Sequence, residues 1–458
     1  MTEPGLSARI AECLCSLCVD NLPERTIEAA KDRLLHGIGV TLVSSQLAAS
    51  SIAWRAVRSE SGTCTVLGRS GQVSAGAAAF ANAVAAHNSL QEDCGPGGLS
   101  EGSHPGTYVL PAALAAAEQI RASGRQLLQA IVSGYEAVGM LGELAPASIV
   151  ARRFRPLGVL GPIGSAAAVA TLWGASPSEL AAALSIAANA ASGYGQGFVA
   201  GSIEPYVHAG YAARNGLLAA TLALAGGTAS PDSFEGPYGF FQTYGGEAGR
   251  ISLTAEEHAI TRLGTKKYAA CLQNQESLEL ILERLPVPIE GSIRTVRLYR
   301  PATPNNGVAS PGVGTHPPYE TMLQRQMSAR FTAAAALLGR PVDDVRYFET
   351  AGSDGPVAQL AARIELISTR EATVRIEVET ADGRTHCADG DMSAALFPAS
   401  EEIRRRFRSR AESVIGAAAA EVEPLIAKLE QVPDVNELLI LLRPQPREPI
   451  YAEHRRLP

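Results

Sequence analysis

Side chains that can transfer protons gather in one polar loop of an alanine-rich stretch, residues 81–116. The candidates in this loop are His87, Glu92, Asp93 and His104. Histidine exchanges a proton near neutral pH, so His104 could act as a general acid or base, and one of the two carboxylates could be the base instead. The loop also contains five glycines, which let the backbone approach a ligand closely. This loop is therefore the first candidate for a catalytic site.

Two cations elsewhere in the chain could hold negative charge. Lys266 could bind a substrate carboxylate or stabilise an enolate-like intermediate as a fixed positive charge. Arg155 is the last of three arginines within four residues, and a guanidinium pairs with a carboxylate through two hydrogen bonds. Tyr268 lies close to Lys266 in the sequence and could donate a hydrogen bond to a substrate.

Every one of these candidates also has a structural interpretation. A histidine in a loop can cap the next helix, and adjacent carboxylates can form a solvated turn. A histidine that ends a helix can make a structural hydrogen bond, a lysine can be solvated, and an arginine can form a structural ion pair. The residue types alone leave these alternatives open.

Hydrophobic periodicity predicts helices in the first 262 residues and strands later in the chain. Apolar residues recur at helical spacing in Ile27–Val43, Ala77–Ala86, Val109–Ile120, Leu127–Leu141, Gly164–Trp173, Glu179–Ala191 and Gly210–Ala225. Alternating patterns with β-branched residues predict strands at Thr295–Tyr299, Ala361–Ile367 and Ala372–Glu379, with a helix at Tyr319–Leu338 among them. A helical pattern resumes after Ser400.

These elements predict a mainly α fold with two domains. Residues 1–262 and 400–458 would form a discontinuous helical bundle, and residues 263–399 a smaller α+β domain that acts as a lid. Active sites often form in the cleft between two such domains, and Lys266 lies at the predicted junction.

Composition excludes several classes of protein. The 458 residues carry a net charge of -7 at pH 7, which argues against a general nucleic-acid binder. No apolar run reaches about 18 residues, so no membrane span is expected. Seven cysteines in a chain of this length indicate reduced thiols and a cytoplasmic location. Cys13, Cys15 and Cys18 have no fourth ligand nearby, so no metal site is expected.

Five motifs in order resemble the MmgE/PrpD family, which includes 2-methylcitrate dehydratase, cis-aconitate decarboxylase and iminodisuccinate epimerase. The motifs lie at Asn82–His87, His104–Ala115, Arg153–Gly164, His208–Ala213 and Lys266–Cys271. The resemblance spans nearly the whole chain, and His104 and Lys266 match the family pattern. It implies a helical domain with an α+β lid, a homodimer, and no metal or organic cofactor. The chemistry it implies is proton abstraction next to a carboxylate, followed by loss of water or carbon dioxide or by reprotonation.

The chain also departs from the family pattern at several positions. The replacements are Leu90 for an aspartate, Arg155 for a histidine, Glu204–Val207 where a lysine is usual, Gln275 for a histidine and Phe331 for a tyrosine. Glu92 and Asp93 keep the two acidic positions that follow Leu90. The lost charged groups make a citrate-like tricarboxylate a poor fit as the substrate.

The sequence therefore predicts a cofactor-free lyase or isomerase that removes a proton next to a carboxylate or carbonyl. The reaction would be a dehydration, decarboxylation, isomerisation or cyclisation of a small molecule other than a simple tricarboxylate, in specialised metabolism. The base would be His104, Asp93 or Glu92, with Lys266 and Arg155 holding negative charge. Further substrate contacts are expected from His87, Glu204, Tyr268 and Gln275. The alternatives are a non-catalytic binding protein on this fold, and an epimerase or racemase with bases on both faces of one carbon.

Overall fold

The computed structural model describes residues 4–94, 103–249, 251, 257–301, 313–314, 319–352 and 355–444. Residues 95–102 of the polar loop and the end of the predicted helical domain, 445–458, lie outside these ranges. None of the described helices is both long and apolar enough to cross a membrane.

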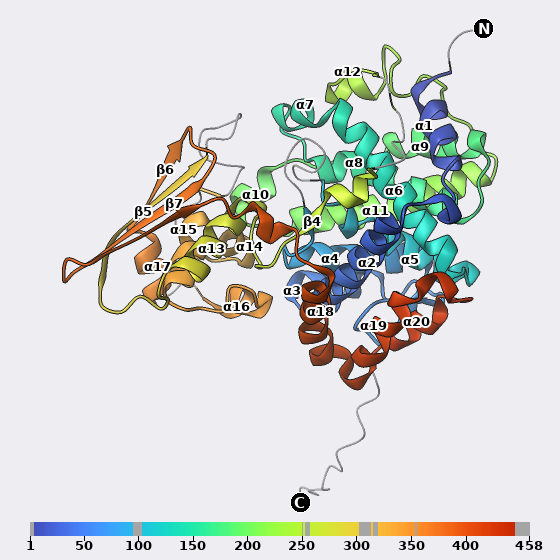
Figure 1. Ribbon diagram of the computed structural model, residues 1–458. Coiled ribbons are helices and arrows are strands. Elements are labelled where there is room, and N and C mark those ends of the chain that lie inside the picture. Colours follow the sequence, from blue (N-terminus) through green and yellow to red (C-terminus); the bar gives the residue numbers. More distant parts are fainter. Residues whose placement is uncertain are drawn as a thin grey trace, which may run out of the picture.

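Figure 1 shows a large helical domain beside a smaller domain with one sheet. The larger domain contains α1 Leu6–Cys15, α2 Glu24–Ser44, α3 Ala48–Val57, α4 Ala75–Asn88, α5 Val109–Ile120, α6 Gly124–Leu144, α7 Pro146–Ala151, α8 Pro156–Leu172, α9 Pro177–Ala188, α10 Gln196–Ala200, α11 Glu204–Leu224 and α12 Phe240–Tyr244. A short ladder of β1 Cys64–Thr65 and β2 Gln72–Val73 precedes α4. The predicted mainly α architecture with a smaller α+β domain is confirmed.

Small residues set the close packing at the centre of the helical domain. Helices α8 and α11 lie against each other there. A Cβ atom at Gly161 would lie 2.6 Å from the Cβ atom of Ala212, so only glycine fits at this crossing. Turn residues define where helices begin: Ser176 accepts a hydrogen bond from Glu179 N and the Glu179 side chain accepts one in return, which forms a capping box at α9.

The smaller domain packs helices against a four-stranded sheet of order β6-β5-β7-β8. Its strands are β5 Ile293–Pro301, β6 Ile364–Thr369, β7 Val374–Thr380 and β8 Thr385–Gly390, and its helices are α13 Leu272–Arg284, α14 Met322–Met327, α15 Ala329–Leu337, α16 Val345–Thr350 and α17 Gly355–Ala361. Strand β5 is parallel to β6 and antiparallel to β7, which pairs with β8. Alternate residues such as Val296 and Leu298 point into the core, as the period of two predicts.

The prediction of one continuous helix over Tyr319–Leu338 is wrong. The segment Tyr319–Leu338 forms two helices, α14 and α15, that meet at Ser328. Ser328 has an extended backbone with ψ 117°, and its hydroxyl accepts a hydrogen bond from Phe331 N. A serine that caps a new helix competes with continuation of the previous one, which the hydrophobic period alone does not reveal.

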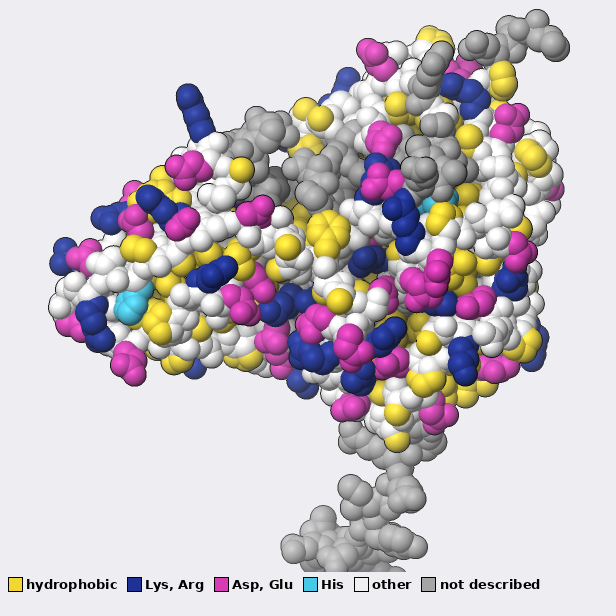
Figure 2. Space-filling model, viewed as in Figure 1, with side chains coloured by type: hydrophobic (Ala, Val, Ile, Leu, Met, Phe, Trp, Pro, Cys, Tyr) yellow, Lys and Arg dark blue, Asp and Glu magenta, His cyan; other side chains and the backbone are white. Residues whose placement is uncertain are grey.

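The chain returns to the helical domain through α18 Ser400–Ile415, α19 Ala419–Ala427 and α20 Asn436–Leu441. Helices α18 and α19 pack against α2 (Figure 1), and Phe407 of α18 lies directly on Gly39 of α2. Side chains of α18 to α20 join the apolar core of the helical domain, whereas the α+β domain has a separate core. Cations and carboxylates alternate on the outer face of α18, and Figure 2 shows both signs mixed over this part of the surface.

A two-strand ladder joins the two domains at the polar loop. Strand β3, Asp93–Cys94, pairs antiparallel with β4, Gly264–Thr265. The backbone N–H of Lys266 also donates to Glu92 O at 3.2 Å. This ladder places the polar loop, which follows α4, beside the segment that opens the α+β domain.

Candidate active site

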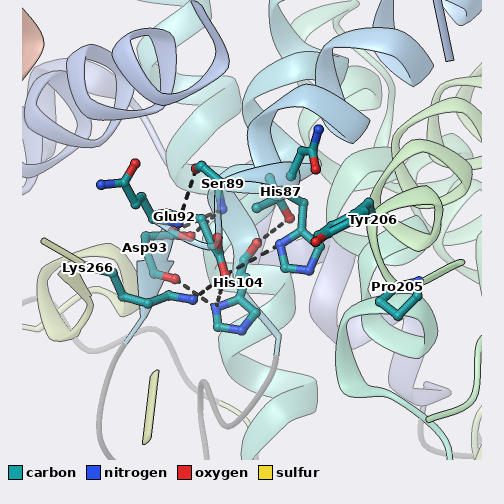
Figure 3. Close-up of polar contacts among 12 residues, drawn as sticks. His87, Ser89, Glu92, Asp93, His104, Pro205, Tyr206 and Lys266 are labelled. Carbon is teal, nitrogen blue, oxygen red and sulfur yellow. Dashed lines mark hydrogen bonds and ion pairs between the residues drawn. The ribbon is translucent and has the colours of Figure 1, made fainter. Parts of the chain in front are cut away.

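The carboxylate of Glu92 lies at the centre of a buried cluster of ionisable side chains. Its Oε1 atom accepts a hydrogen bond from Lys266 Nζ, and it lies 3.4 Å from His87 Nδ1 and 3.5 Å from His104 Nδ1. Figure 3 shows these four side chains directed toward one another. Each of them is at most 6% exposed. The structure therefore brings together four of the predicted site residues.

Charge within this cluster favours an ionised Glu92. Burial alone would raise the pKa of the carboxyl, but the positive charge of Lys266 holds that pKa well below its usual range. Glu92 is therefore an anion at neutral pH, paired with the Lys266 ammonium. A carboxylate in this state is a weak base, so its position favours charge stabilisation over proton abstraction.

The ring of His104 is held as a neutral base. Its Nδ1 lies 2.9 Å from the carbonyl oxygen of Asp93. A carbonyl only accepts, so Nδ1 carries the proton and the lone pair is on Nε2. Burial, followed by the charge of Lys266, keeps the pKa of His104 well below its usual value. A neutral imidazole with its lone pair on Nε2 can accept a proton.

Asp93 holds the turn that carries His104. Its carboxylate accepts hydrogen bonds from Gly106 N, at 2.9 Å and 3.1 Å, and from the Tyr135 hydroxyl at 2.7 Å. Burial raises the pKa of Asp93 to about 6. Because both oxygens are engaged by structural donors, the geometry favours a positioning role for Asp93 under His104.

Arg155 connects the cluster to the start of α11. It caps α8, and its two terminal nitrogens donate to Pro205 O and to His87 Nε2, each at 2.6 Å. Its guanidinium also lies over the ring of Phe198, 4.6 Å from the ring centre. Since His87 Nε2 accepts, its proton is on Nδ1, which faces Glu92. Burial lowers the pKa of His87 to about 4, so this ring is neutral as well.

Three predicted substrate contacts lie outside this cluster. The Tyr268 hydroxyl donates to Glu279 within the α+β domain. Gln275 is buried and bonds to the backbone of Lys267, Tyr268 and Ala270, so it holds the segment that follows Lys266. Glu204 is exposed at the first turn of α11. Their positions favour structural roles for Tyr268 and Gln275 and give Glu204 no contact with the cluster.

Gln91 crosses the domain junction and was not among the sequence-predicted site residues. Its side-chain nitrogen donates to Lys267 O and to Asp343 O, both at 2.8 Å. It is 1% exposed. Gln91 thus ties the polar loop to the backbone immediately after Lys266.

Gln326 of α14 makes the reciprocal connection from the α+β domain. Its side-chain nitrogen donates to Ser89 O at 2.9 Å and Asn88 O at 3.3 Å. Its oxygen accepts from the Tyr206 hydroxyl at 2.7 Å, and the Tyr206 ring lies 6.2 Å from the His87 ring. No local pattern marks Gln326, because its partners are at least 120 residues away.

Leu90 lies between these two glutamine contacts in a strained backbone conformation. Its φ is +54°, a region that non-glycine residues rarely adopt. The side chain is buried in a small apolar cluster with Val84, Tyr206 and Met327 at the domain junction. An apolar wall therefore stands beside the ionisable cluster.

Among the described residues, no group of three or more His, Cys, Asp or Glu side chains is arranged to hold a metal ion. Cys271, in the Lys-Lys-Tyr-x-x-Cys motif, lies at the edge of the apolar cluster and is partly exposed.

Comparison with known proteins gives the same family along most of the chain. The profile of the MmgE/PrpD N-terminal domain matches residues 8–250. The chain is 28% identical over 482 residues to a cis-aconitate decarboxylase-like protein of Aspergillus oryzae, covering 96% of this chain and 98% of that protein. It is 25% identical to cis-aconitate decarboxylase of Aspergillus terreus over 98% of both chains. It is 26% identical to the human cis-aconitate decarboxylase, over 98% of this chain and 97% of that one.

Proposed function

The chain belongs to the MmgE/PrpD family, and on this premise we propose a lyase-type enzyme whose reaction removes a proton next to a carboxylate or carbonyl without a cofactor. The observation that carries the proposal is the neutral His104, with its lone pair on Nε2, beside the Lys266–Glu92 ion pair. Relatives named as decarboxylases support the lyase class.

Each residue of the cluster has a role in this proposal. His104 Nε2 takes the proton, and the imidazolium that forms is stabilised by Glu92, 3.5 Å from Nδ1. The electron pair left on carbon moves to the substrate oxygen, where the Lys266 ammonium holds the developing charge. An ammonium has three donors, and one of them serves Glu92. Arg155 binds a substrate carboxylate.

Proton removal is followed by one of several steps. The enolate expels water from the neighbouring carbon, is reprotonated, or closes a ring. A decarboxylation follows a different order: carbon dioxide leaves first, and the carbanion takes a proton that His104 Nε2 has accepted from solvent beforehand. The buried position of the cluster excludes water, which strengthens these electrostatic contacts.

We also propose that the substrate is not a simple tricarboxylate and belongs to specialised metabolism. Cis-aconitate carries three carboxylates, but Leu90 presents an apolar side chain at the junction and Lys266 is already paired. The test is incubation of the purified protein with cis-aconitate and with 2-methylcitrate, followed by product analysis. No turnover of either is expected, and efficient turnover of either contradicts this part of the proposal.

Solvent exchange tests the proposed chemistry independently of product formation. In deuterium oxide, a substrate should gain deuterium at the carbon next to its carboxylate or carbonyl, because His104 exchanges the abstracted proton with solvent. Ligand binding without exchange would favour a non-catalytic binding protein. Exchange with inversion at that carbon and no net elimination would favour an epimerase.

We also propose that the protein forms a homodimer and is located in the cytoplasm. Helix α11 exposes Tyr211, Leu218 and Leu222 on one side, each between 46% and 53% exposed, and such a stripe favours a protein contact. Leu218→Glu should shift the mass measured by light scattering from dimer to monomer, whereas Ile440→Glu on the distant α20 should not.

All seven cysteines are free thiols, which favours a reducing compartment.

A further inference from the structure

Buried cations around the candidate active site differ in how their charge is balanced. Lys266 is paired with Glu92. Arg33 lies in the wall behind the site, where its charge acts on Asp93, and both residues line the same small internal cavity. The α+β domain contributes further buried cations.

Arg325 of α14 is buried on that side, where it donates to backbone carbonyls and Glu349 acts on its charge. Arg300 of β5 is buried there as well. It donates to the side-chain oxygen of Asn274 at 3.2 Å and to Gln273 O. The carboxylate of Glu276, on the same helix α13, acts on its charge. Each of these cations thus has a carboxylate nearby.

Arg155 has no carboxylate of its own, because Glu92, which acts on its charge, is already paired with Lys266. Its hydrogen-bond partners are a carbonyl oxygen and the neutral ring of His87, and within the described part of the chain it forms no ion pair. It is 7% exposed, so its charge is poorly solvated. Among the described residues, Lys266 and Arg155 therefore share one carboxylate, which leaves one positive charge for a ligand.

The surroundings of Arg155 on the junction side are apolar. The ring of Phe198 lies under its guanidinium, and Phe198 packs against the cluster that contains Leu90, Tyr206 and Met327. A second carboxylate placed there would be desolvated with no cation to pair with, a large cost. An alkyl or alkenyl group would instead be stabilised.

We infer that the site takes a substrate with one carboxylate, bound by Arg155, and an apolar remainder against the Leu90 cluster. This inference rests on the proposed function and specifies its substrate class. In this arrangement Arg155 binds the substrate carboxylate. Glu92 neutralises Lys266, so Lys266 has no charge left to bind a second carboxylate.

The test compares three six-carbon acids that differ in their number of carboxylates: hexanoate, adipate and tricarballylate. Binding to the full-length protein is measured by isothermal titration calorimetry at pH 7.5. Hexanoate should bind at least 10-fold more tightly than adipate, and tricarballylate more weakly still. Equal or tighter binding of adipate or tricarballylate overturns the inference.

Variants identify the groups responsible. Arg155→Gln should weaken hexanoate binding at least 10-fold, and Arg155→Lys should restore part of it because the charge remains. Glu92→Gln frees the Lys266 ammonium and should strengthen adipate binding relative to hexanoate by about 10-fold. Lys267→Gln, which removes a neighbouring cation paired with Glu279, should change none of these values. Melting curves of each variant show whether it is folded.

These outcomes separate the inference from the proposed function. If hexanoate binds as expected but gains no deuterium at its α-carbon, and neither do other bound monocarboxylates, the catalytic proposal fails while the binding class stands. If a di- or tricarboxylate binds best and is turned over, the binding class fails while the lyase remains. Unchanged hexanoate binding in folded Arg155→Gln also overturns the inference.

Discussion

His104 has φ +47° and ψ +61°, a left-handed conformation that costs energy in a residue with a Cβ atom. The conformation persists because Asp93 holds the turn with two hydrogen bonds. Its carboxylate accepts from Gly106 N, and its carbonyl oxygen accepts from Nδ1 of the His104 ring. Strain and hydrogen bonding together aim the imidazole at Glu92. Asparagine tolerates the same backbone region, which makes it the informative replacement.

His104→Asn should keep the fold and abolish proton transfer. Loss of a general base lowers the rate about 10² to 10⁴-fold. The measurement is deuterium incorporation into the α-position of a bound monocarboxylate, with melting temperature as the check on folding. His386→Asn, on the outer strand β8, is the control and should leave exchange unchanged. An active His104→Asn would exclude this ring as the base.

Gly106→Ala should destabilise the protein by about 1–3 kcal/mol, the usual range for overpacking a core. The added Cβ atom would lie 2.9 Å from the Tyr135 hydroxyl and 3.0 Å from Asp93 Cγ. Gly76→Ala in α4 is the matched control: its Cβ atom would meet only the Arg214 side chain of α11, at 3.7 Å, so helix propensity should raise stability by about 0.5–1 kcal/mol. Chemical denaturation measures both, and equal effects would contradict the packing argument.

At the scale of elements, the loop between α4 and β3 is held from both domains. Gln91 reaches across to backbone carbonyls after Lys266, and Gln326 reaches back to carbonyls after α4. Each contact satisfies a buried carbonyl, so removing either glutamine leaves polar groups unpaired. The two side chains thereby set the distance between His87 and Lys266, which lie on different domains.

Gln326→Ala should cost about 1–3 kcal/mol of stability, the penalty for unpaired buried groups. Amide hydrogen exchange should accelerate in residues 86–92 and at β4, because the junction opens more often. Gln129→Ala removes a comparable bond, to Leu17 O inside the helical domain, and should leave junction exchange unchanged. Protection at the junction that survives Gln326→Ala would show that the contact is not needed for closure.

Local patterns predict elements well and their long-range partners poorly. The helices of the first half, the strands β5, β6 and β7 and the cap at Ser176 follow from periodicity and turn chemistry. The break at Ser328 does not, since a serine within an apolar repeat reads as helix. The β3–β4 ladder and Gln326 depend on contacts across more than 100 residues, for which no local rule exists.

The same limit applies to the candidate site. The polar loop, His104 and Lys266 stand out by residue type, and the structure places them together. The pairing of Glu92 with Lys266, the support of the turn by Asp93 and the isolation of Arg155 are properties of burial and geometry. Sequence reasoning therefore identifies the candidate residues that the structure brings together but leaves the role of each one open.

At the scale of the whole molecule, buried histidines control the response to acid. The pKa is lowered in His36, His87, His104, His208 and His258, in each case mainly by burial. For His208 it falls to about 3. In the unfolded chain these rings take up protons near pH 6.5, whereas the folded rings remain neutral. Acid therefore favours the unfolded state.

The free energy of unfolding should rise as pH increases from 5 to about 7 and then level off. A single histidine contributes about 1–2 kcal/mol over this window, from 1.4 kcal/mol per pH unit. Four acids act in the opposite direction: burial raises the pKa of Asp93 to about 6, that of Glu136 to about 7, and the pKa values of Asp32 and Glu276 as well, so their contribution falls as pH rises. The histidines outnumber them, so the net slope is positive.

Urea denaturation at pH 5, 6 and 7 measures this slope. His208→Gln, which lies outside the proposed catalytic set, should flatten it, and Glu136→Gln should steepen it. A flat profile in the unchanged protein, or a slope of opposite sign, would contradict the assignment of neutral histidines in the folded state.

The interrupted path of the helical domain has a consequence for biosynthesis. Gly39 of α2 is covered by Phe407, which lies more than 360 residues later in the chain. The first half of the chain therefore leaves the ribosome with part of its apolar core exposed to water. The α+β domain has a core of its own and can condense as soon as it emerges. Chaperone demand during translation should therefore concentrate on the nascent N-terminal half, and a stop codon before α18 should yield a product that the cell degrades.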